Sequence, residues 1–161
     1  MARFESLMLS EMPNGAWRTR IPVRFGSCDP AGIVYTPEYL NLFNGAVEDW
    51  YGEALGLPYH ELVGKRRTGL GYAHASADFA TPSTMGDVLD VAIIVRNIGR
   101  TSVTFSVHAF KEGTECVRAT FVTVTTSLID HKAIALPEDL RRALTRYQAR
   151  CDNSAEMLSQ C

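Results

Sequence analysis

The chain has 161 residues, of which 46% are hydrophobic and 21% are charged, and its formal net charge at pH 7 is -2. This length favours one domain with a substantial core, and the composition is that of a soluble globular protein. The slightly acidic balance indicates neither a nucleic-acid partner nor a basic membrane-binding patch. No apolar run reaches the about 18 residues of a membrane span, and the N-terminus lacks the features of a signal peptide. We therefore expect a cytoplasmic protein.

The four cysteines are scattered along the chain, at Cys28, Cys116, Cys151 and Cys161. They form no CxxC pair and have no zinc-ligand spacing with the histidines, so we predict no metal site. An even number of cysteines would permit disulfides, but reduced thiols are the default in the cytoplasm.

The first elements run from an irregular segment into a strand and a turn. Residues 1–15 show no periodicity and are interpreted as a tail or an extra edge element. The segment Trp17–Phe25 predicts a strand, because Ile21 and Val23 alternate with polar residues and proline. A turn over residues 26–35 follows.

A long helix comes next. Thr36 is predicted as its N-cap and Pro37 as its first helical residue, and Gly56 provides a left-handed stop. Its apolar residues cover much of the circumference, which predicts a helix buried on most sides. They are Tyr39, Leu40, Leu42, Phe43, Ala46, Val47, Trp50, Tyr51, Ala54 and Leu55.

The second half of the chain is predicted to form an antiparallel meander of four strands. Alternation, β-branched residues and turn signals place these strands at residues 69–80, 89–97, 102–110 and 116–127. A charged helix begins near Pro137. The pattern predicts an α+β domain over residues 16–150, with a tail at 151–161. A curved sheet of about five strands wrapped around one long helix fits it. Such a sheet has exposed edges, so we expect at least a homodimer.

Asp29 is the leading candidate for a catalytic group. It precedes Pro30 in the turn between the first strand and the long helix. A carboxylate near a helix N-terminus is well placed for acid–base or nucleophilic chemistry. The alternative is an aspartate that only caps backbone groups of the turn.

The sequence around this turn, RFGSCDPAGIVYTPEY, resembles the signature of the 4-hydroxybenzoyl-CoA thioesterase family. The resemblance extends over residues 20–140 and implies a hotdog fold. It also implies that Asp29 attacks the thioester carbonyl or activates a water molecule. The family's oxyanion donor falls on the backbone N–H of Thr36, where an aromatic residue is usual.

Further site residues follow from the same resemblance. Arg100 corresponds to a basic cluster that contacts the phosphates of CoA; otherwise it is a solvated hairpin arginine. Asn44 stands where 4-hydroxybenzoyl-specific members have an aspartate that recognises the substrate hydroxyl, which leaves the acyl group open. Tyr35 is expected to contact the substrate.

Alternation places Tyr72 and His74 on one face of their strand, where family members line the acyl site. Glu48 lies one helical turn after Asn44 and is a reserve candidate for the base. Cys28 lacks a neighbouring base and is expected to be a small buried residue rather than a nucleophile. His108 is expected to face outward.

The sequence thus predicts an acyl-CoA thioesterase that hydrolyses an aromatic or short-chain acyl-CoA to a carboxylate and free CoA. We expect it to need no metal or redox cofactor. CoA enters the reaction as part of the substrate. We expect a homodimer or homotetramer. The alternatives are an acyl-CoA hydratase or dehydratase and a non-catalytic acyl-CoA-binding protein. Hotdog hydratases use a histidine near the central helix, and this chain has none between Met1 and Tyr59.

Overall fold

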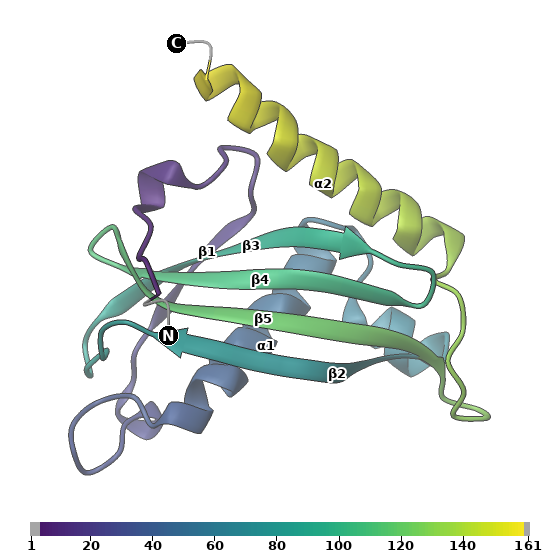
Figure 1. Cartoon of the computed structure of the whole chain (residues 1–161). Coiled ribbons are helices and arrows are strands. Elements are labelled where there is room, and N and C mark those ends of the chain that lie inside the picture. The colour runs from purple at the N-terminus through teal and green to yellow at the C-terminus, as the bar shows by residue number, and fades with distance from the viewer. Residues whose placement is uncertain (1–3, 160–161) are drawn as a thin grey trace.

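The computed structural model describes residues 4–159, which form a five-stranded antiparallel sheet with one long helix packed on a face and a second helix along an edge (Figure 1). The strands are β1 (Arg18–Pro22), β2 (Thr68–Phe79), β3 (Val88–Ile98), β4 (Ser102–Lys111) and β5 (Thr114–Ser127). Their order in the sheet is β1-β3-β4-β5-β2.

The expected strands are present, but the prediction of a four-strand meander is wrong. Only β3, β4 and β5 form a meander, because β2 pairs with β5 and not with β3. The loop over residues 80–87 carries the chain across the end of the sheet. It is held there by hydrogen bonds from Val34 N–H to Ser83 C=O and from Val23 N–H to Asp87 C=O, both 2.8 Å.

Helix α1 (Thr36–Glu53) packs against one face of the sheet, as its apolar pattern predicts. The indole ring of Trp50 lies 5.6 Å from the ring of Phe105 on β4. The side chains that α1 buries against the sheet are Tyr39, Phe43, Ala46, Val47, Trp50 and Tyr51. Gly56 ends the helical segment with a φ of 68°, the left-handed conformation that glycine adopts without steric cost.

Helix α2 (Glu138–Ser159) runs along the edge of β3 (Figure 1) and meets the end of α1 there, where the rings of Trp50 and Tyr147 lie 5.3 Å apart. Because β1 pairs only with residues 88–92, the second half of β3 has no neighbouring strand there. The Tyr147 hydroxyl donates to Ile93 C=O at 2.6 Å, and the Gln148 amide donates to Val95 C=O at 3.4 Å. The helix therefore satisfies backbone acceptors that would otherwise be a free sheet edge.

The N-terminal segment crosses the face of the sheet that points away from α1. It contains a short 3-10 helix, η1 (Leu9–Glu11), and one isolated bridge between Met8 and Thr114. The Leu9 amide donates to Gly113 C=O at 2.8 Å, and the Glu115 amide donates to Leu7 C=O at 2.9 Å. The described part of residues 1–15 is thus attached to the β4–β5 hairpin without forming a strand.

A buried polar cluster lies beneath this segment. The Glu115 carboxylate accepts hydrogen bonds from Arg118, from the Leu7 amide at 3.0 Å and from His108 Nδ1 at 2.6 Å. His108 Nε2 lies 2.8 Å from Ser106 Oγ, to which Arg96 Nε also donates. The expectation that His108 faces outward is therefore wrong in one respect. Its ring points away from α1, but it is 0% exposed because the N-terminal segment and the arginines cover it.

This cluster predicts that the protein loses stability in acid. Burial lowers the pKa of His108, and the charges of Arg96 and Arg118 add to this effect. Burial opposes ionisation of Glu115, but bonds from Arg118, the Leu7 amide and His108 outweigh it and lower that pKa. Both groups therefore bind more protons in the unfolded chain. The urea midpoint should fall as the pH drops below about 6.5, and further below about 4.5. A midpoint that stays constant from pH 7 to 5 would show that His108 titrates normally.

Candidate active site

Asp29 lies in a tight hairpin between β1 and α1. An isolated bridge pairs Cys28 with Val34, and the Asp29 amide donates to Ile33 C=O at 3.0 Å. The Gly32 amide donates to Asp29 C=O at 2.9 Å, and Gly32 has a φ of 81° that glycine tolerates best. The Ala31 amide holds Asp29 Oδ1 at 2.8 Å. Among the described residues Oδ2 has no hydrogen-bond partner, so one carboxylate oxygen is available for chemistry.

The same hairpin leads directly into the N-terminus of α1. The helix begins at Thr36, so the prediction of Thr36 as N-cap is wrong by one residue; Tyr35 is the N-cap. Its amide donates to Ser27 C=O at 2.9 Å, which keeps Tyr35 extended. Tyr35 provides no side-chain cap, and Pro37 has no N–H. Within residues 4–159 the Thr36 N–H has no acceptor, which leaves a donor at the positive end of the helix.

Two hollows border the hairpin, and its consecutive residues Gly32 and Ile33 each line one of them. One, of about 440 Å³, contains Asp29 and is lined by Phe25, Cys28, Asp29, Pro30, Gly32 and Met85. The other, of about 180 Å³, contains Thr36 and is lined by Ile33, Val34, Thr36, Tyr39, Phe79, Ala80, Thr81 and Pro82. The structure thus places the predicted carboxylate and the predicted N–H donor on one short hairpin segment, each bordering a hollow.

The loop over residues 80–87 supports this hairpin. Thr84 forms a bridge to Ile33, and the Asp87 carboxylate accepts from the Thr84 amide at 2.7 Å. That bond, together with the charge of Lys111, lowers the pKa of Asp87. The Lys111 ammonium also donates to Pro82 C=O at 3.0 Å. The sequence indicated a turn here but gave no signal that it supports the Asp29 hairpin.

Tyr72 and Asn44 meet on the α1 side of the sheet. The Tyr72 hydroxyl donates to Asn44 Oδ1 at 2.9 Å. Burial raises the pKa of Tyr72 to about 12, so the phenol remains protonated and donates at neutral pH. Glu48 lies one helical turn after Asn44 and is exposed. These three residues form a polar patch that joins the exposed side of α1 to β2.

The prediction that Tyr72 and His74 share a face is wrong. A bulge between them shifts the register, so that Tyr72 is opposite Thr123 while His74 is opposite Val122. The Tyr72 ring packs on Phe121, 5.1 Å away, on the α1 side. His74 instead lies 3.2 Å from Ser76 Oγ on the other face, because one extra residue reverses the alternation. It therefore lies away from the Tyr72–Asn44 contact.

Arg100 lies at the opposite end of the sheet from Asp29. It is in the β3–β4 hairpin, whereas the Asp29 hairpin contacts Thr84, just before β3 begins. The 11 residues of β3 separate the two ends, a span of roughly 35 Å at the usual rise per residue. Arg100 is exposed and cannot reach Asp29 within one chain.

Cys28 is half-buried rather than buried, and its thiol lines the hollow of Asp29. Its Sγ donates to Arg24 C=O at 3.6 Å, and no histidine among the described residues contacts it. Without a base, Cys28 is not an activated nucleophile.

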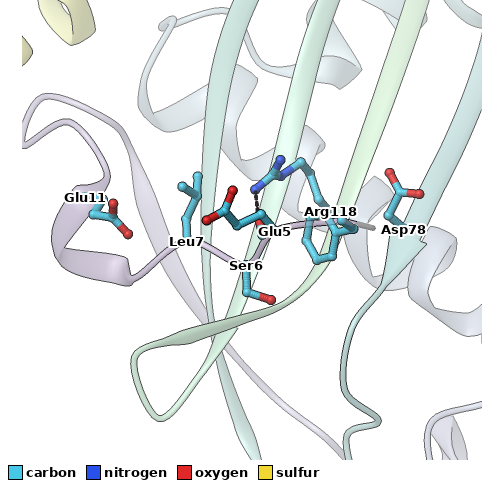
Figure 2. Close-up of a pocket in the computed structure, with 7 residues that line it drawn as sticks. Glu5, Ser6, Leu7, Glu11, Asp78 and Arg118 are labelled. Carbon is cyan, nitrogen blue, oxygen red and sulfur yellow. Dashed lines mark hydrogen bonds between the residues drawn. The ribbon is translucent and has the colours of Figure 1, made fainter. Parts of the chain in front are cut away.

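A third hollow, of about 570 Å³, lies on the face of the sheet away from α1 (Figure 2). In this hollow the Arg118 guanidinium donates to Glu5 C=O at 3.2 Å. The acidic residues Glu5, Glu11 and Asp78 also line the hollow. The charge of Arg118 is already neutralised by Glu115, so the three acidic side chains give this hollow a net negative charge. Such a charge would repel the phosphates of CoA.

Ser106, His108 and Glu115 follow the hydrogen-bond order of a hydrolase triad. Ser106 is only 3% exposed, however, and the guanidinium of Arg96 bonds to its hydroxyl. A substrate carbonyl has no route to this oxygen. We therefore assign this cluster to stability.

An antiparallel sheet packed around one long helix, with a DPAG hairpin at the start of that helix, defines a hotdog thioesterase-like protein. Residues 23–144 match the sequence profile described as the thioesterase-like superfamily. The chain belongs to this superfamily. No helix among residues 4–159 is long and apolar enough to span a membrane.

The individual proteins and structures that the chain resembles share a quarter of its sequence or less, or only slightly more. The chain is 23% identical to a 1,4-dihydroxy-2-naphthoyl-CoA hydrolase of Prochlorococcus marinus over 127 residues, which is 74% of this chain and 83% of that protein. A thioesterase superfamily structure from Jannaschia sp. matches with a TM-score of 0.78 and 26% identity, over 84% of this chain and 94% of that one. A Staphylococcus aureus protein, solved in complex with CoA, matches with a TM-score of 0.78 and 15% identity, over 86% and 87% of the two chains.

Proposed function

We propose that the protein is an acyl-CoA thioesterase that hydrolyses an aromatic or short-chain acyl-CoA to a carboxylate and free CoA. The observation that carries the proposal is Oδ2 of Asp29, which has no hydrogen-bond partner among residues 4–159 and belongs to the hairpin that leads into the N-terminus of α1. Membership of the thioesterase-like superfamily supports the reaction class. The name of the Prochlorococcus relative supports an aromatic acyl group.

Two routes use Asp29. In the nucleophilic route, Oδ2 attacks the thioester carbonyl, the C–S bond breaks, and CoA leaves as a thiolate that takes up a proton. Water then hydrolyses the mixed anhydride. In the general-base route, Oδ2 accepts a proton from the water molecule that attacks the carbonyl. In both routes the Thr36 N–H donates to the oxyanion, aided by the dipole of α1. Water is the only co-reactant.

We further propose that the substrate is bound between two copies of the chain. β2 is an edge strand with no second strand partner among residues 4–159, and pairing two such edges antiparallel would bring the Arg100 end of one copy toward the Asp29 end of the other. Arg100 would then contact the CoA phosphates. Sedimentation at the mass of one chain would contradict this arrangement.

Replacing Arg100 by alanine should raise KM for acyl-CoA about tenfold while leaving kcat unchanged, because a phosphate contact far from the carbonyl contributes equally to ground state and transition state. Steady-state kinetics measures both parameters. Arg142→Ala, which removes an exposed arginine of α2, is the control. Equal changes in the two variants would indicate a general charge effect.

A panel of aromatic, short-chain and long-chain acyl-CoA thioesters tests the function, with released thiol measured for the wild type. The Asp29→Asn variant provides the blank. Turnover of an aromatic or short-chain thioester by the wild type alone is the expected result. If the wild type releases thiol from none of them, the protein is not an acyl-CoA thioesterase.

A further inference from the structure

Two large apolar side chains in the wall of the Asp29 hollow are left exposed. Phe25 is 82% exposed and Met85 is 59% exposed, and both line the hollow of about 440 Å³. In these positions the two side chains do not contribute the hydrophobic stabilisation that burial would provide. Exposed apolar groups gathered around a reactive carboxylate indicate a surface that a ligand covers.

We propose that Phe25 and Met85 are specificity-determining residues of an acyl subsite, and that they select uncharged, planar acyl groups. This inference rests on the thioesterase activity proposed above. Neither residue is part of the DPAG segment of the hairpin, and they lie far apart in the sequence.

The position of Asp29 requires the substrate to enter this hollow. A carbonyl that is attacked by the carboxylate lies about 3–3.5 Å from it. One of the two groups attached to that carbonyl therefore lies against Phe25 and Met85. Apart from the Asp29 carboxylate, the only polar side chain among the residues that line the hollow is Cys28, whose thiol is a weak donor.

This lining favours the acyl group over the pantetheine arm. The arm carries amide groups, which lose free energy when they are desolvated without partners. An aromatic acyl ring has no such requirement. The neighbouring hollow contains the hydroxyls of Thr36 and Thr81 and suits the arm better. The charge of Asp29 also disfavours an acyl group that bears a second carboxylate.

Hydrogen bonds hold the backbone that carries these two side chains. Phe25 begins the 3-10 turn η2 (Phe25–Ser27), which is closed by the Cys28 amide donating to Phe25 C=O at 3.1 Å. Met85 precedes Gly86, whose amide donates to Val23 C=O at 3.0 Å. A ring and a thioether on this backbone offer favourable contacts to a flat aromatic group. A flexible chain gains less from them.

Kinetics with two matched substrates tests the inference. Benzoyl-CoA and heptanoyl-CoA have the same number of acyl carbons but differ in planarity. Phe25→Ala and Met85→Ala should each lower kcat/KM for benzoyl-CoA about tenfold and for heptanoyl-CoA less than about threefold. Ile129→Ala removes a remote apolar side chain that is 80% exposed, and it should change neither value.

The outcomes separate the two proposals. If both substrates lose activity equally, or neither does, Phe25 and Met85 do not select the acyl group, while the thioesterase activity stands. If the wild type hydrolyses neither substrate nor any other thioester of the panel, the proposed function fails and this inference fails with it.

Protection of Cys28 provides a measurement without turnover. In the Asp29→Asn protein, a benzoyl-CoA analogue with a methylene in place of the thioester sulfur should slow alkylation of Cys28 by iodoacetamide, measured by mass spectrometry of its peptide. The heptanoyl analogue should protect less, and adding Phe25→Ala should remove the difference. Equal alkylation rates with and without saturating benzoyl analogue would show that the acyl group lies elsewhere.

Discussion

Replacing Asp29 by asparagine should lower kcat by about 10²–10⁴-fold, the contribution of a positioned acid–base group. The substitution keeps the size of the side chain and an oxygen that can accept from the Ala31 amide. It removes the charge and basicity of Oδ2, which has no other partner among the described residues. The hairpin should therefore keep its conformation while the chemistry stops. Thiol release under saturating substrate measures the effect, and an unchanged urea midpoint shows that the fold is intact.

Glu48→Gln is the matched control for Asp29→Asn. Glu48 is the other carboxylate that the sequence offers as a base, and it lies exposed on α1. The variant should retain activity within about threefold of the wild type, as expected for a surface charge away from the reacting atoms. If Glu48→Gln loses activity and Asp29→Asn keeps it, Glu48 is the base.

A single turnover of the wild type in ¹⁸O-water distinguishes the two routes that use Asp29, because label in the Asp29 carboxyl shows that Asp29 acts as nucleophile.

Replacing Glu115 by glutamine should lower the free energy of unfolding by about 3–5 kcal/mol, the cost of removing one member of a buried ion pair. Glu115 is fully buried and accepts from Arg118, His108 and the Leu7 amide. The neutral amide leaves the Arg118 guanidinium without its carboxylate. Because Leu7 bonds to the same side chain, hydrogen exchange at the amides of residues 5–12 should also accelerate. Urea unfolding and exchange mass spectrometry measure the two effects.

Glu112→Gln is the control for this substitution. It lies on the same β4–β5 hairpin but is exposed. This substitution should change the free energy of unfolding by no more than about 0.5 kcal/mol. If Glu115→Gln costs no more than Glu112→Gln, the charge of Glu115 does not hold the cluster together, and packing of the N-terminal segment does.

The elements and the Asp29 hairpin could be predicted from sequence because their signals are local. Alternation, Pro37 and Gly56 each act within a few residues. Strand pairing is not local: nothing within β2 shows that it bonds to β5. The bulge after Tyr72 also has no local signal in the sequence. It made the predicted face of His74 wrong, because a shift of one residue moves every following side chain to the other face.

The remaining site features depend on segments that are distant in the chain. Phe25 and Met85 reach one hollow only because the loop over residues 80–87 returns to the Asp29 hairpin. His108 looked like a surface residue because its alternation marks the side of the sheet away from α1. That side is covered by the N-terminal segment, whose irregular sequence gave no sign of where it packs.

The two long edges of the sheet differ in what they permit. On one side, β1 presents Pro22 and two arginines, and α2 occupies the rest of β3. On the other side, β2 offers a continuous set of backbone groups. A chain with one blocked and one open edge can add strands in a single direction. Association through sheet edges therefore ends at a closed pair, and a growing fibre has no second edge from which to extend.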